Sequence, residues 1–100
     1  MELMQLQGLI AVAEQGTLHK AAVKLSRTTP AVSAAIRKLE KELGVTLFEH
    51  SNSQLRLTAA GEELVNYAKR LLSLQDEALA AVEQVKMAKA CRPKSQGQAK

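Results

Sequence analysis

Aromatic residues and cysteine are nearly absent from this chain of 100 residues. Phe48 and Tyr67 are its only aromatic residues, so a hydrophobic core has to be built from Leu, Val, Ile and Ala, which favours helices over a β-sandwich. Cys91 stands alone, and this excludes a disulfide framework or a cysteine metal cluster. The five glycines lie at separate positions and form no phosphate-binding loop.

Long apolar runs are also missing. No segment approaches the ~20 apolar residues of a membrane span. Polar Glu2, Gln5 and Gln7 interrupt the start, where a signal peptide would lie. The two histidines, His19 and His50, lie on different elements, and the sequence brings no catalytic arrangement of Ser, Cys or carboxylate to either one, so we expect both at the surface. We therefore expect a cytosolic protein that is not an enzyme, has no cofactor and has no membrane partner.

Two amphipathic helical patterns meet across a short turn between residues 16 and 43. The apolar positions of the first are Leu18, Ala21, Ala22 and Leu25, and those of the second are Val32, Ile36, Leu39 and Leu43. Thr17 is a natural N-cap for the first helix, and Gly44 ends the second. Because Thr29 precedes Pro30, we expect Thr29 as the second N-cap and Pro30 as the first helical residue. This arrangement predicts a helix-turn-helix.

Positive charge gathers on the two helices with their turn and in the tail. The net charge is +4, and Lys20 to Lys41 contain six basic residues against one acidic residue, Glu40. A helix presented with a basic outer face has the right size for the DNA major groove. The basic segment from Cys91 to Lys100 is expected to be disordered.

The surrounding segments complete a small domain. Apolar residues at helical spacing predict a first helix from about Leu3 to Gly16, packed behind the other two. Two short strands, at 45–48 and 55–57, flank a polar tip at 50–54 and predict a wing. The fold class is therefore mainly α: a winged helix-turn-helix with a three-helix core and a two-stranded wing, followed by a long helix.

That long helix begins after its N-cap, Thr58, and runs to about Lys89, roughly 45 Å at ~1.5 Å per residue. Its apolar positions alternate at spacings of four and three, as in a coiled coil. Pairing with a second copy is the favoured interpretation, and a helix folded back on its own domain is the alternative. The predicted dimer interface consists of Leu64, Ala68, Leu71, Leu72, Gln75, Ala78, Leu79 and Val82.

The order of these motifs resembles the N-terminal domain of LysR-type transcriptional regulators. The resemblance covers residues 3–88 and depends on three segments in order: 17–22, 29–49 and 57–62. It implies a winged helix-turn-helix at 1–57, a dimerising linker helix at 58–90 and a basic tail at 91–100. It further implies a dimer that binds pseudo-palindromic promoter DNA, with a higher oligomer left open for a full-length form. The effector-binding domain usual in the family is absent here, so no small-molecule site is expected.

Several positions depart from the family pattern. The family usually has Gln before the proline and Arg after the serine of the recognition helix, where this chain has Thr29 and Ala34. Small side chains here can touch thymine methyl groups but lose bidentate base contacts worth ~1–3 kcal/mol each. Arginine is also common where His50 and Ser53 stand, and Arg27 replaces an aliphatic residue in the turn, where we expect it to reach solvent or phosphate.

The predicted DNA contacts divide by chemistry. Thr28, Ser33 and Arg37 are assigned to phosphates, and Thr29, Pro30 and Ala34 to base edges. Longer-range attraction is assigned to Lys38 or Lys41, and the remaining candidates are Arg27, Ser53 and Arg56. The alternative function is a dimerising interaction module that modulates a full-length regulator without reading DNA.

Overall fold

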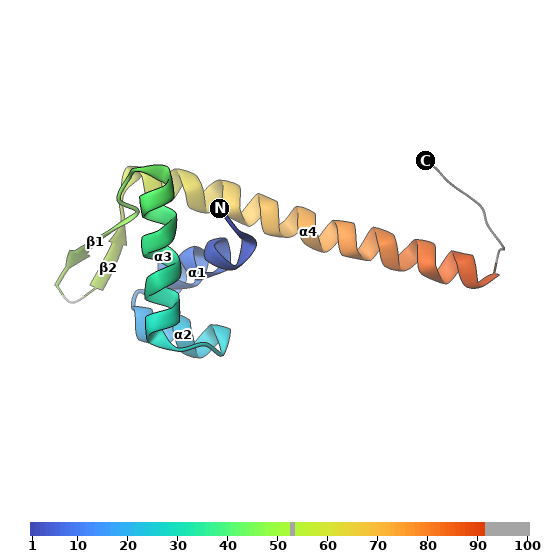
Figure 1. The fold of residues 1–100 in the computed structure, drawn as a ribbon, viewed down its shortest axis with the longest axis horizontal. Coiled ribbons are helices and arrows are strands. Elements are labelled where there is room, and N and C mark those ends of the chain that lie inside the picture. The colour runs from blue at the N-terminus through green and yellow to red at the C-terminus, as the bar shows by residue number, and fades with distance from the viewer. Residues whose placement is uncertain (53, 92–100) are drawn as a thin grey trace.

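The computed structural model describes residues 1–52 and 54–91. Its elements are α1 (Leu3–Gln15), α2 (Leu18–Leu25), α3 (Thr29–Leu43), β1 (Phe48–Ser51), β2 (Gln54–Leu57) and α4 (Ala59–Cys91). The predicted fold class is confirmed: three helices cluster, a β-hairpin extends from them as a wing, and α4 projects away (Figure 1). Ser53 and the predicted tail beyond Cys91 lie outside the described residues.

Helix α1 lies at the centre of the core because it packs against α2, α3 and α4. Its Leu9 and Val12 are fully buried, and they share one apolar cluster with Ala21 of α2 and Leu39 of α3. The predicted stripes of α2 and α3 supply buried or partly buried residues to this cluster, with one exception. Leu43, predicted as the last position of the α3 stripe, is 41% exposed at the C-terminal end of α3.

The first strand begins three residues later than predicted. β1 starts at Phe48 and pairs antiparallel with β2, with Phe48 opposite Leu57 and His50 opposite Leu55. His50 therefore belongs to a strand, and not to the polar tip as predicted. The ladder stops before residue 47 because Leu47 N donates to the Glu40 carboxylate (2.7 Å) and not to a strand, although Leu47 O still accepts a hydrogen bond from Thr58 N.

The start of α4 fits closely against this loop. Thr58 caps the helix as predicted, because its hydroxyl accepts a hydrogen bond from Gly61 N (3.1 Å), and it also donates to Thr46 O (2.6 Å). Gly61 has no side chain where the backbone of Leu47 passes: a Cβ built on it would lie 2.3 Å from Leu47 O. These contacts fix the direction in which α4 leaves the domain.

Only the first part of α4 packs on the domain. Val65 and Ala68 are buried in the core cluster, so the core continues past residue 57 and into the helix. From Lys69 onward most side chains are exposed. The helix of 33 residues is about 50 Å long at ~1.5 Å per residue. Its distal part therefore stands clear of the core, as Figure 1 shows.

Candidate nucleic-acid interface

A tight turn holds α3 in front of the domain. α2 ends at Ser26 in the left-handed conformation (φ 57°), and Arg27 N closes the turn with a hydrogen bond to Ala22 O (2.9 Å). Thr28 then caps α3, because its hydroxyl accepts a hydrogen bond from Ala31 N (3.2 Å). The turn between the two helices is therefore three residues long and fixed by its own hydrogen bonds.

The predicted cap of α3 was one residue too late. Thr29 is the first helical residue, and Thr28 is the N-cap. The physical reason is that the first four amides of a helix have no intrahelical partner, so Pro30 is tolerated in the second helical position as well as in the first. The prediction relied on the extended preference of a residue before proline, which is a bias and not a prohibition.

The outward side of α3 carries the predicted contact residues. Pro30, Ala34, Arg37 and Lys41 are exposed and spaced four, three and four positions apart, which places them in one row along the helix. We call this row the α3 ridge. Lys38 is exposed beside it, whereas Ser33 and Thr29 are half-buried at its flank. The buried residues Val32, Ile36 and Leu39 hold the opposite side against the core.

The acidic residues of α3 are engaged away from the ridge. The Glu40 carboxylate accepts hydrogen bonds from Leu47 N (2.7 Å) and Phe48 N (3.4 Å), so it anchors the loop that leads into the wing. Glu42 pairs with the amino group of Met1 (2.5 Å). The sequence pattern gave no sign of the Glu40 contact, because its partners are backbone amides of a loop. The ridge is left with basic residues as its only charged members.

The turn residues lie at the same end of the motif as the start of the ridge. Arg27 is exposed, which confirms that it does not enter the core, and Thr28 is exposed as well. The Thr28 hydroxyl still has its proton to donate after accepting from Ala31 N. An arginine and a hydroxyl donor therefore lie beside the N-terminus of α3, where both can bind an anion. The helix dipole also favours negative charge at this end.

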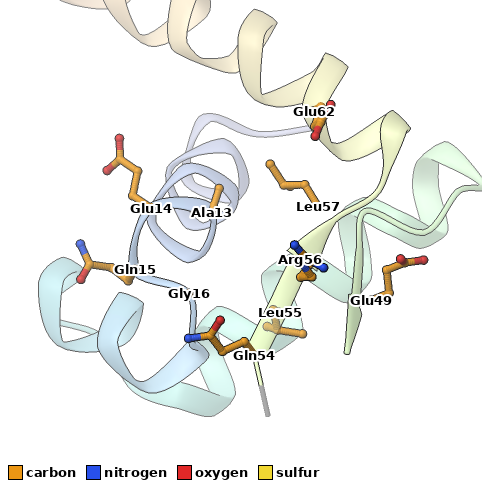
Figure 2. Close-up of a pocket in the computed structure, with 10 residues that line it drawn as sticks. All are labelled: Ala13, Glu14, Gln15, Gly16, Glu49, Gln54, Leu55, Arg56, Leu57 and Glu62. Atoms are coloured by element: carbon orange, nitrogen blue, oxygen red, sulfur yellow. The ribbon is translucent and has the colours of Figure 1, made fainter. Parts of the chain in front are cut away.

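The wing contributes less positive charge than the ridge. Arg56 of β2 is exposed and lies directly opposite Glu49 of β1 in the strand register. Arg56 lines a hollow of about 670 Å³ together with Glu14, Glu49 and Glu62 (Figure 2). Arg56 is the only basic residue among those that line this hollow, whereas three of them are acidic, so Arg56 is a weaker candidate for phosphate than Arg37. His50 is exposed on β1, as is His19 on α2, which confirms both predicted surface positions.

The side chains that line the hollow in Figure 2 do not converge on a common point as those of a catalytic or metal site would. Its carboxylates come from separate elements, Glu14 from α1, Glu49 from β1 and Glu62 from α4, and Figure 2 shows them apart. Within residues 1–52 and 54–91, no three His, Cys, Asp or Glu side chains gather as metal ligands would. In the same residues, no helix is both long enough and apolar enough to cross a membrane.

The distal part of α4 exposes a long apolar surface. Leu71, Leu79, Val82 and Val85 are between 39% and 65% exposed. Of the residues predicted for the dimer interface, Ala68 is fully buried in its own domain and is therefore not available to a partner helix as predicted, whereas Leu64 is partly buried against the same core. Leu72 and Gln75 are half-exposed, and Ala78 is exposed. Leu74, which the prediction omitted, is 60% exposed.

Comparison with known proteins places this arrangement among regulators. A family model described as "Bacterial regulatory helix-turn-helix protein, lysR family" matches residues 3–62. The "Probable RuBisCO transcriptional regulator" of Guillardia theta is 42% identical over 82 residues, which is 82% of this chain and 26% of that protein. The "HTH-type transcriptional regulator YofA" of Bacillus subtilis (strain 168) is 44% identical over 68 residues, 68% of this chain and 24% of that protein. The chain thus spans about a quarter of the length of these curated relatives.

Solved structures give the same fold. The CbnR_DBD–DNA complex superposes with a TM-score of 0.81 at 36% identity, over 86% of this chain and 99% of that one. The BenM_DBD complex with catB site 1 DNA gives a TM-score of 0.82 at 35% identity, over 86% of this chain and 96% of that one. Both comparison proteins were therefore solved on DNA with a domain of nearly the same extent.

Proposed function

Because the chain belongs to the lysR family of bacterial regulatory helix-turn-helix proteins, we propose that it binds double-stranded DNA as a transcriptional regulator. One observation carries the proposal: α3 is held in front of the domain with a ridge whose only charges are positive, in a fold shared with two proteins solved on DNA. A binding role of this kind uses no catalytic group, and we propose that the protein is not an enzyme. Its proposed place of action is the bacterial cytoplasm, where the DNA lies.

The α3 ridge and the turn before it are proposed to contact different parts of the DNA. Arg37, Lys38 and Lys41 are proposed to neutralise phosphates along the groove, supported by their exposure and by the inward engagement of Glu40. Arg27, Thr28 and Ser33 are proposed to contact the phosphate backbone of the DNA beside the N-terminus of α3. Thr29, Pro30 and Ala34 come first along the helix, where recognition helices meet base edges. Arg56 and Ser53 are proposed as secondary wing contacts.

The proposed active form is a dimer that pairs distal α4 helices. The exposed apolar row of Leu71, Ala78 and Val82, extended by Leu79 and Leu74, supports this, because exposed apolar rows at heptad-like spacing are stabilised by burial against another helix. Two domains joined in this way would present two α3 helices to two half-sites of a pseudo-palindromic promoter. A higher oligomer belongs to the proposal only for a full-length form.

DNA binding is tested by Arg37→Ala at two salt concentrations. If Arg37 neutralises one phosphate in each half-site, the variant should bind more weakly and its slope of log K against log salt should be shallower by ~0.9 per protomer, or ~1.8 for the proposed dimer. Arg70→Ala is the matched control, because Arg70 is an exposed arginine on α4, stacked 4.6 Å from the centroid of the Tyr67 ring and away from the ridge. Wild-type protein that fails to bind any duplex at low salt would refute the proposal and favour an interaction module.

Dimerisation is tested by Leu71→Lys in analytical ultracentrifugation. A charge in the apolar row should shift the protein to monomers at a concentration where the wild type is dimeric, because an unpaired buried charge is costly. Ser73→Lys adds the same charge at an exposed position on another side of α4 and should remain dimeric. An unchanged dimer in Leu71→Lys would show that this row is not the interface.

A further inference from the structure

The α3 ridge changes chemistry along its length. Pro30 and Ala34, nearer the N-terminus, are exposed and small, and neither has a polar side-chain atom. Arg37 and Lys41, nearer the C-terminus, are long and cationic. We call Pro30 and Ala34 the apolar tip. It lies at the end of α3 that follows the turn, so in a recognition helix it is the part that meets base edges.

The composition of the apolar tip restricts what it can read. A side chain without donor or acceptor cannot distinguish bases by hydrogen bonding, and Pro30 also lacks a backbone N–H. The thymine C5 methyl is the apolar feature of the major-groove edge. Thr29, beside the tip, is half-buried and starts the helix. The tip is therefore complementary to a methyl group and to no polar base atom.

On the basis of the proposed DNA binding, we propose that the apolar tip selects pyrimidines with a C5 methyl group, thymine and 5-methylcytosine alike. Both bases carry the methyl on the same ring carbon. They differ at position 4, where thymine has an acceptor and cytosine a donor, and side chains without polar atoms do not sense that difference. Methylation of a cytosine at the contacted position would thus convert a poorly bound C·G pair into a bound one.

The size of the effect follows from one buried methyl. Burial of a CH₂ group contributes ~0.8 kcal/mol, which corresponds to about fourfold in affinity. A dimer that contacts one methyl in each of two half-sites should therefore lose about sixteenfold in affinity when both are removed. The basic end of the ridge contacts phosphates in this arrangement, so its contribution should not depend on which base carries a methyl.

The test uses the full chain and a duplex that it selects from a random-sequence pool. Each thymine of the selected half-site is replaced in turn by uracil, which removes only the methyl, and then by 5-methylcytosine or cytosine paired with guanine. Fluorescence anisotropy at one salt concentration gives each Kd. We expect one position per half-site at which uracil and cytosine weaken binding about fourfold or more while 5-methylcytosine restores it.

Two results would overturn the inference while leaving DNA binding intact. Equal affinity for thymine and uracil at every position would show that no methyl is contacted. Weak binding of 5-methylcytosine at the uracil-sensitive position would show that the thymine O4 acceptor is read together with the methyl, so that the two methylated pyrimidines are not bound alike. If no duplex is enriched and none binds at low salt, the proposed DNA binding itself fails, and this inference fails with it.

Variants assign the effect to the tip. Ala34→Gly and Pro30→Ala each remove apolar surface, and at least one should reduce the ratio of thymine to uracil affinity, with circular dichroism confirming the fold. Arg37→Ala should weaken binding to every duplex by one common factor and leave the ratio unchanged. If neither tip variant alters the ratio, the methyl is read by another residue and the assignment is wrong.

Discussion

The substitution Gly61→Ala probes the junction between α4 and the domain. An added Cβ would lie 2.3 Å from Leu47 O, 2.8 Å from Leu57 Cδ2 and 3.2 Å from Leu47 C. The closest approach is about 1.1 Å short of ordinary van der Waals contact, which starts at 3.4 Å. Leu47 O cannot retreat freely, because it accepts the hydrogen bond from Thr58 N (3.0 Å). The helix and the loop would have to separate.

The expected cost follows from two opposing effects. Alanine in place of glycine inside a helix stabilises by ~1 kcal/mol. Overpacking against a constrained neighbour costs ~1–3 kcal/mol and sometimes more. Because the obstacle is backbone, we expect the upper end of that range and a net loss of about 2 kcal/mol in the free energy of unfolding. For a chain of this size, that corresponds to a fall of about 10 °C in Tm.

Gly8→Ala is the matched control, because it makes the same change in α1. There an added Cβ would meet only Val32 Cγ1, at 3.9 Å. The propensity gain should then dominate and stabilise the protein by ~0.5–1 kcal/mol. Urea denaturation followed by circular dichroism at fixed protein concentration measures both variants, since dimer formation is linked to stability. Gly61→Ala protein as stable as the wild type would refute the close-approach reasoning.

Three further substitutions test other contacts by urea denaturation. Glu40→Ala should lower the free energy of unfolding by ~1–3 kcal/mol, because Leu47 N and Phe48 N lose their acceptor. Glu40→Gln retains a carbonyl oxygen and should lower it less. Equal losses of stability in the two variants would contradict the hydrogen-bond account. Thr28→Ala should cost ~1 kcal/mol through loss of the α3 cap, with Thr28→Ser near wild type. Leu39→Ala should cost ~2–5 kcal/mol, since Leu39 is fully buried, and a loss below 1 kcal/mol would be inconsistent with that burial.

Local patterns predicted the elements well where the signal is local. The cap at Thr17, the stop at Gly44 and the burial of Ala21, Ala22, Val32 and Ile36 all follow from spacing and side-chain chemistry within one helix. Errors occurred where two local preferences competed. Both Thr28 and Thr29 can cap a helix, and the choice between them depends on how α3 meets the turn. Val45 and Leu47 favour a strand, but Leu47 N donates to the Glu40 carboxylate and so leaves the ladder.

The candidate interface was predictable in its residues but not in its electrostatics. Exposure of Arg37, Lys38 and Lys41 follows from their position opposite the apolar stripe of one helix. The counting of Glu40 against that charge missed its engagement with two backbone amides. Arg56 was predicted as the basic contact of the wing, and only the strand register placed Glu49 directly opposite it. Such pairings involve residues that are distant in sequence.

The sequence by itself determined the helix-turn-helix, its family and the apolar start of the α3 ridge, because each depends on the order and type of nearby residues. Only the tertiary structure decided how much of α4 is free to pair. Its apolar repeat runs on without a visible break, yet Ala68 is fully buried in the domain while Val82 is 59% exposed. An apolar repeat in the sequence indicates only that its residues lie on one side of a helix. Which neighbour covers each turn depends on where the domain core ends in space.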